Sequence, residues 1–242
     1  MGKKLKVQRR GRGTPTFKAK KTGKIAPTRY PIQGEEALNG VIRDLLHEPG
    51  RGAPLAYVEL EGGAGYFTAA PEGVHIDQSV SLGPGAPLKI GNVRPLGKIP
   101  EGTMVCNVEL RPGDGGKLAR SSGSFAIVVA HIGDKTTLKL PSKKSIEVND
   151  NCRATIGIVS GGGRKEKPFM KAGEKHYAKR AKGQIYPVTK GVKMTAASHP
   201  HGGGRHRRPG KSTTVSRHAP PGKKVGLIAA RNSGKKKRRR RS

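Results

Sequence analysis

The chain contains no tryptophan, and aromatic residues make up only 4% of it. Modules that bind single-stranded RNA by stacking bases depend on exposed aromatic rings, so this composition argues against such a platform. Long apolar stretches are also missing, and no run approaches the roughly 18 residues of a membrane-spanning helix. Residues 1–12 are basic, but no apolar segment follows them, which argues against a secretory signal.

Cysteine is scarce, with only Cys106 and Cys152 in the chain. They form no CxxC pair of the kind that binds zinc, and each lies in an apolar stretch. Free cysteine is among the most buried residue types, so both are predicted to be small buried hydrophobic residues. A disulfide between them is the alternative. This cysteine usage is typical of an intracellular protein.

Acidic side chains are few, 16 against 49 Lys and Arg, and the formal net charge is +33. A chain so charged repels itself, and a polyanion such as a nucleic acid would relieve that repulsion. Residues 1–33 carry 11 basic and no acidic side chains, residues 34–160 carry 13 and 14, and residues 161–242 carry 25 and 2. A nearly neutral middle is thus flanked by two basic arms, which are too polar to form a core and are expected to be largely disordered in the free protein.

The middle of the chain has the pattern of an all-β protein. Its short segments are rich in Val, Ile and Leu and are bounded by Gly and Pro, which predicts strands. These strands are expected at residues 40–47, 55–60, 65–70, 74–82, 104–110, 124–131, 136–140, 145–148 and 155–159. Residues 41–46 could also be helical, but their β-branched start and the following Pro-Gly favour a strand. Two small barrels, joined near residues 87–95, would accommodate this number of strands.

Three patterns that could indicate catalysis or ligand binding are incomplete. Residues 204–212 resemble a phosphate-binding GxxxxGK[ST] loop, but five residues instead of four separate the glycines and no strand precedes them. His199 and His201 could bind a metal, yet no carboxylate or thiol lies nearby to complete the site. No Ser/His/Asp signature is present. The sequence therefore predicts no catalytic residue and no metal site.

Two triple-glycine clusters are more informative. Gly161–Gly163 precede Arg164, and Gly202–Gly204 precede Arg205. Glycines without side chains let the backbone approach a phosphate closely, and the following Arg neutralises its charge. A flexible linker is the alternative, but the position of both clusters in the basic C-terminal arm favours RNA contact. The Lys/Arg run at 235–241 is expected to be a solvated tail that could also act as a nuclear targeting signal.

The segment His199-Pro200-His201-Gly202-Gly203-Gly204 resembles the signature of large-subunit ribosomal protein two, the universal L-two family. Further segments similar to this family are residues 48–56, 90–93, 100–103, 112–120 and 160–164, so the resemblance covers nearly the whole chain. Arg205-His206 and residues 219–231 resemble the archaeal and eukaryotic cytoplasmic branch, and the short loop 61–65 favours an archaeal source.

The resemblance implies a mainly β fold with an OB-type barrel followed by an SH3-like barrel. The implied domains are a basic N-terminal extension at 1–33, the OB-type barrel at 34–86, the SH3-like barrel at 87–160 and a basic C-terminal extension at 161–242. The implied function is that of a structural constituent of the large ribosomal subunit. In this role it binds ribosomal RNA and supports subunit assembly, subunit association and the architecture around the peptidyl-transferase region, near which His199 is expected to lie.

The same resemblance implies a cytoplasmic, ribosome-bound protein that is not an enzyme. Its expected partners are large-subunit ribosomal RNA and neighbouring ribosomal proteins, with no membrane and no small-molecule substrate. No cofactor is expected, and magnesium enters only as a counterion of the RNA. The rival hypotheses are a DNA-compacting protein, which would explain the arms but not the barrels, and an enzyme acting on RNA with His199 as general base.

The residues expected to contact RNA are basic, histidine or glycine residues of the arms and of the barrel loops. They are Arg9, Arg10, Arg12, Lys18, Lys20, Lys21, Arg51, Lys117, Arg120, Gly161, Gly162, Gly163, Arg164, Lys165, His199, His201, Gly202, Gly203, Gly204, Arg205, His206, Arg207, Arg208, Lys211, Arg217, Lys223, Lys224 and Arg231.

Overall fold

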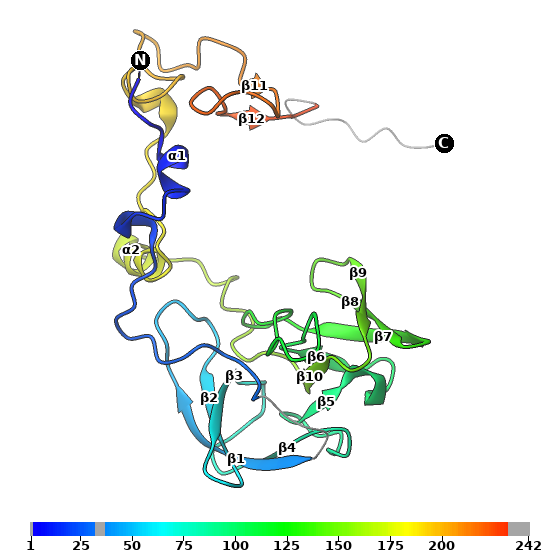
Figure 1. Ribbon diagram of the computed structural model, residues 1–242. Helices are drawn as coiled ribbons and strands as arrows, with labels where there is room; N and C mark the ends of the chain where they lie inside the picture. The colour runs from blue at the N-terminus through cyan, green and yellow to red at the C-terminus, as the bar shows by residue number, and fades with distance from the viewer. Residues whose placement is uncertain (1, 32–36, 232–242) are drawn as a thin grey trace. The chain divides into compact units, whose positions relative to one another are not determined.

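The computed structural model describes residues 2–31 and 37–231. The chain divides into two compact units. Residues 21–170 form one of them, here called the barrel unit, and residues 1–20 with 171–242 form the other, here called the terminal unit. The fold is mainly β, which confirms the predicted fold class (Figure 1). None of the helices in the described part has the length and apolar character needed to cross a membrane.

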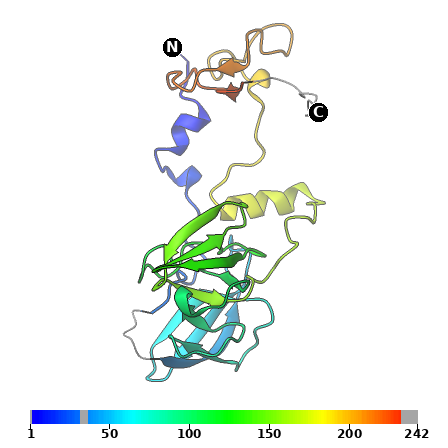
Figure 2. The ribbon, with the colours of Figure 1, turned by 90° about the vertical axis from the view of Figure 1, so that its right-hand side faces the viewer.

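The barrel unit contains one ten-stranded sheet, in the order β3-β2-β1-β4-β5-β10-β6-β7-β8-β9. Neighbouring strands are antiparallel except for β4 and β5, which pair in parallel through Leu82 and Val93. The strands are β1 (Leu38–Leu46), β2 (Leu55–Leu60), β3 (Gly65–Ala69), β4 (Ser79–Leu82), β5 (Val93–Pro95), β6 (Met104–Cys106), β7 (Ala126–Ile132), β8 (Lys135–Lys139), β9 (Ser145–Asn149) and β10 (Arg153–Ile156). Figure 2 shows the earlier strands, in blue and cyan, and the later strands, in green, as two groups.

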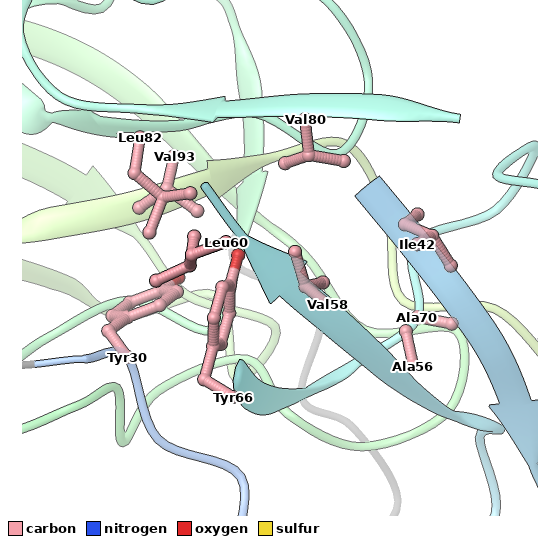
Figure 3. Close-up of a cluster of buried hydrophobic side chains, with 10 residues drawn as sticks. All are labelled: Tyr30, Ile42, Ala56, Val58, Leu60, Tyr66, Ala70, Val80, Leu82 and Val93. Carbon is pink, nitrogen blue, oxygen red and sulfur yellow. The ribbon is translucent and has the colours of Figure 1, made fainter. Parts of the chain in front are cut away.

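Each group of strands encloses its own hydrophobic core. The first core consists of Tyr30, Ile42, Ala56, Val58, Leu60, Tyr66, Ala70, Val80, Leu82 and Val93, which converge from several strands in Figure 3. The second consists of Leu96, Ile99, Val105, Val108, Ala126, Val128, Leu138, Val148, Cys152 and Ala154. Side chains alternate between faces of a strand, so the period-two pattern of the sequence places its apolar residues in these cores. The domain boundaries at 33/34, 86/87 and 160/161 stay predictions.

Several predicted strands are shorter in the structure than the sequence pattern indicates. Within 74–82 only residues 79–82 form a strand, because Asp77 adopts a left-handed backbone with φ of 63° and turns the chain. The strand predicted at 104–110 ends at Cys106, since Asn107 has φ of 48°. The predicted connection at 87–95 contains β5. The strand predicted at 40–47 is confirmed as β1, and residues 41–46 are not helical.

Both cysteines are free and buried, as predicted. Cys106 and Cys152 are each 0% exposed, and burial raises the pKa of Cys106 to about 12 and that of Cys152 to about 11. Neither thiol therefore carries the thiolate that metal binding or nucleophilic chemistry requires at neutral pH.

A buried polar network fastens the segment 28–31 into the barrel unit. Arg153 donates from one guanidinium nitrogen to Glu109 at 2.8 Å and from another to the Pro31 carbonyl at 2.9 Å. The guanidinium also lies 5.2 Å from the ring centroid of Tyr30, whose hydroxyl donates to the Asn107 carbonyl at 2.7 Å. Glu109 is 0% exposed and Tyr30 is 5% exposed. Part of the predicted N-terminal extension is thus built into the barrels.

The terminal unit has little regular structure and few buried side chains. It contains α1 (Lys6–Arg10), α2 (Ala172–Ala181) and the parallel pair β11 (Thr214–Val215) and β12 (Leu227–Ile228). Helix α2 has Glu174 in its first turn and Lys179 and Arg180 in its last, an arrangement that complements the helix dipole. Sequence patterning missed these elements, because none of them has an apolar face that periodicity could reveal. The expected disorder of the arms in the free protein stays a prediction.

Candidate nucleic-acid interface

Positive charge is concentrated in the terminal unit. Its described residues include 23 Lys and Arg side chains and a single acidic one, Glu174. The five ion pairs that join two described residues all lie in the barrel unit. The cations of the terminal unit therefore have almost no acidic partners within their own unit, and their mutual repulsion favours a polyanionic ligand.

Most of the predicted RNA-contact residues of the terminal unit are exposed. The exposed side chains are those of Arg9, Arg10, Arg12, Lys18, Lys20, Arg205, His206, Arg207, Arg208, Lys211, Arg217, Lys223 and Arg231. Lys224 and the two histidines of the signature are half-buried. Lysine and arginine side chains of this kind can neutralise phosphates without reading the base sequence. The run at 235–241 lies outside the described residues.

The two signature histidines are held by their own loop. The backbone N–H of His201 donates to Nδ1 of His199 at 3.0 Å, and the two rings lie 5.1 Å apart. Because Nδ1 accepts a hydrogen bond, the proton of the neutral ring is on Nε2. Burial, and then the nearby His201, lower the pKa of His199. His199 is therefore a neutral imidazole with one N–H available to an RNA acceptor.

Glycines make this loop compact. A Cβ at Gly191 would overlap the imidazole of His199, and a Cβ at Gly202 would overlap the carbonyl oxygens of Met194 and Thr195. A Cβ at Gly204, in contrast, would make only an ordinary contact with the His206 carbonyl oxygen, at 3.8 Å, and this glycine has φ of +80°. The triple glycine thus has two roles: Gly202 is required by packing within the loop, and only the later part of the cluster is free for close approach of a ligand.

A second glycine-rich surface lies on the barrel unit. The guanidinium of Arg164 and the hydroxyl of Ser122 lie where a Cβ of Gly52 would be, and Gly162 packs against Gly123. Three loops distant in sequence therefore meet at the first glycine cluster. The residues of 161–165 are exposed, as is Lys117. Lys21 is also exposed, and it precedes the segment 28–31 that is anchored in the barrel unit.

Two of the predicted contact residues already have intramolecular partners. Arg51 forms an ion pair with Glu48 at 3.0 Å and donates to the Ala26 carbonyl at 3.2 Å. Arg120 donates to the carbonyls of Gly116 and Thr28 at 2.9 and 3.0 Å. Burial, and then the charge of Arg51, lower the pKa of Arg120. Both side chains hold the N-terminal arm on the barrels.

Sequence reasoning missed Lys175, Lys179 and Arg180, three basic residues of α2. Together with the aromatic residues Phe17 and Tyr186 they line hollows of the terminal unit. The available signal was the composition Ala-Gly-Glu-Lys-His-Tyr-Ala-Lys-Arg-Ala, which is rich in good helix formers. No group of three His, Cys, Asp or Glu able to hold a metal occurs among residues 2–31 and 37–231.

Comparison with known proteins identifies the family of the chain. Residues 89–223 match the family described as Ribosomal Proteins L2, C-terminal domain. The chain is 58% identical over 240 residues to a protein of Korarchaeum cryptofilum named large ribosomal subunit protein uL2, and the match covers 99% of this chain and 98% of that protein. Proteins of the same name from Hyperthermus butylicus and Methanothermobacter thermautotrophicus are 51% and 52% identical, and each match covers 98% of this chain and 100% of the relative. The chain therefore belongs to the family of large ribosomal subunit protein uL2.

Proposed function

We propose that this protein is a structural constituent of the large ribosomal subunit that binds large-subunit ribosomal RNA through its terminal unit and the glycine-rich loops of its barrels. The observation that carries the proposal is the 23-to-1 excess of basic over acidic side chains in the described part of the terminal unit. Neutralising phosphates releases condensed counterions, which drives association. Family membership supports the same assignment.

The barrels serve as anchors in this proposal. Their near-neutral charge and two hydrophobic cores make them a folded base, from which the basic arms extend along RNA. Shape and phosphate contacts position such a protein, and few base-specific contacts are needed. The roles in subunit assembly, in subunit association and in the architecture of the peptidyl-transferase region rest on the family resemblance. So do contacts with neighbouring ribosomal proteins and a cytoplasmic location.

The protein is proposed to have no enzymatic activity and no resident cofactor, with magnesium acting only as an RNA counterion. The geometry of His199 favours this view, because no carboxylate in the described part of the chain orients its ring and its Nδ1 is engaged by the backbone. A general base needs a free acceptor within hydrogen-bond reach of the proton it removes. His199 instead presents an N–H, which suits support of RNA structure.

Sedimentation of the tagged protein from a cell lysate tests the proposal. We expect it to co-migrate with large ribosomal subunits at low salt and to remain there after DNase treatment. Co-migration with chromosomal DNA that DNase abolishes would replace the proposal with the rival function of DNA compaction.

A further inference from the structure

The terminal unit contains a hollow lined by aromatic rings, which the low aromatic content of the chain does not suggest. Phe17, from the short 3₁₀ helix Pro15–Phe17, and Tyr186, which follows α2, line a space of about 690 Å³. Ile185 and Val188 add apolar surface to the same hollow. Pockets for small ligands usually have volumes of about 300–1,000 Å³, so the space is sufficient for one nucleotide.

Cations border both aromatic rings. The guanidinium of Arg10 lies 6.0 Å from the ring centroid of Phe17, and Nζ of Lys175 lies 5.3 Å from that of Tyr186. Lys179 lines the hollow as well, and none of its lining residues is acidic. Aromatic rings beside positive charges are suited to a planar, electron-rich group that carries an anion, and a nucleotide has both features.

The walls of the hollow are fixed by the backbone. Gly183 has φ of +66°, and a Cβ there would overlap the backbone of residues 17–19, so the loop after α2 packs tightly against the N-terminal arm. Gln184 is held at both ends: its N–H donates to the Lys179 carbonyl at 2.9 Å, and its side-chain oxygen accepts from Nζ of Lys179 at 2.9 Å. The site is therefore built from two distant parts of the chain.

A second, smaller hollow adjoins the same loop. It has a volume of about 360 Å³ and shares residues 183–186 with the first. Lys18, Lys20 and Arg180 line it together with His176. Three cations beside an aromatic hollow are placed to neutralise the phosphates on either side of an inserted base.

We propose that the aromatic hollow receives one unpaired base of RNA, which stacks on Tyr186 or Phe17 while Lys18, Lys20 and Arg180 bind the flanking phosphates. This deepens the proposed function and rests on it. Unpaired bases of structured RNA are commonly recognised by stacking on aromatic side chains, and an inserted base would fix the register of a protein whose other contacts are to the backbone. Two rings suffice for one base, so the shortage of aromatic residues along the chain is no obstacle.

Ultraviolet cross-linking of the full-length protein bound to large-subunit ribosomal RNA, followed by mass spectrometry, tests the site directly. We expect nucleotide adducts on Tyr186 or Phe17. Tyr177, on α2 but outside both hollows and 68% exposed, is the internal control and should carry none above background. Adducts on Tyr177 without any in the hollow, or cross-links of the hollow to another protein in assembled subunits, would overturn the proposal.

Binding measurements with variants separate stacking from charge. Tyr186→Leu and Phe17→Leu should each lower the affinity for this RNA by about 5- to 150-fold at every salt concentration, the range expected for loss of one stacked base. The dependence of affinity on salt should not change, because no charge is removed. Tyr186→Phe should retain the wild-type affinity, which would show that the leucine variant fails through loss of the ring and not through misfolding.

Tyr177→Leu is the matched control and should bind like the wild type. Unchanged affinity of both hollow variants would refute the inserted base while leaving the proposed function intact. Failure of the wild-type protein itself to bind ribosomal RNA in a salt-dependent manner would instead refute the proposed function, and the inserted base with it.

Discussion

At the scale of single residues, His199 is the clearest example of a side chain whose role depends on its neighbours. Its Nδ1 accepts the His201 N–H, its ring packs against Gly191, and its pKa is lowered by burial and by His201. Because the folded-state pKa lies below the usual value near 6.5, the ring is neutral at physiological pH. Any stability that depends on the neutral ring is present above that value and is lost as the pH falls through the folded-state pKa.

Replacing His199 by Gln tests whether this imidazole takes part in proton transfer. Gln keeps a hydrogen-bond donor but does not titrate, so we expect fully assembled large subunits with His199→Gln to form peptide bonds at a normal or mildly reduced single-turnover rate across pH. Any larger defect should appear in the yield of assembled subunits. A loss of several orders of magnitude in properly assembled particles, with the pH dependence abolished, would make His199 catalytic.

At the scale of structural elements, the connection between β10 and the N-terminal arm depends on the buried pair of Glu109 and Arg153. Glu109 also accepts backbone N–H groups of Gly115 and Arg153 at 3.0 and 2.9 Å. We expect Glu109→Gln to lower the free energy of unfolding by about 3–5 kcal/mol, because it leaves the guanidinium of Arg153, whose side chain is only 13% exposed, without its counter-charge. Urea unfolding followed by circular dichroism measures this change.

The matched control for that variant is Glu59→Gln. Glu59 pairs with Arg43 at 2.6 Å, but both side chains are exposed, 40% and 53% respectively. An exposed pair contributes at most about 1 kcal/mol, so the control should be nearly neutral. Equal decreases in the free energy of unfolding of the two variants would contradict the view that the Glu109–Arg153 network holds the arm on the barrels.

The elements differ in how far the sequence predicts them. The strands at 55–60, 136–140 and 145–148 could be located because alternating apolar residues and Gly or Pro boundaries are local signals. β5 could not, because three residues carry no periodicity and their pairing depends on distant partners. The same limit applies to the interface: Gly161–Arg164 could be singled out, but not its contact with Gly52 and Gly123, which only the folded chain brings together.

At the scale of the whole molecule, the barrel unit extends further toward the N-terminus than the charge pattern suggests. Thr28 and Tyr30 are buried, and the N–H of Arg29 donates to the Phe67 carbonyl at 3.0 Å. We expect limited trypsin digestion of the free protein to leave a fragment that begins upstream of Thr28 and ends between 160 and 171. Mass spectrometry of the fragments checks both ends. A fragment beginning after Arg29 would show that the arm is released in solution, and complete digestion would argue against folded barrels.

The charge asymmetry of the molecule predicts how salt acts on RNA binding. Replacing Arg205, Arg207, Arg208 and Lys211 by Gln should reduce the slope of log affinity against log salt by about 3, since each lost phosphate contact contributes about 0.7–0.9. The control replaces the exposed Lys135, Lys139, Lys143 and Lys144 of the barrel unit by Gln. It should change the slope by less than the contribution of one phosphate contact. A larger effect in the control set would move the main RNA surface to the barrels.

The order of strands in the sheet has a consequence for synthesis of the chain. β10, the last strand of the barrels to be translated, lies between β5 and β6, which are made much earlier. The edges of β5 and β6 that pair with β10 therefore have no strand partner while residues 107–152 are being translated. The same strand carries Arg153, which fastens Pro31 and Tyr30. The contacts of Arg153 with Pro31 and Tyr30 therefore form only in this late step, which also completes the sheet, and they add to the earlier contacts of the arm with Arg51, Phe67 and Arg120.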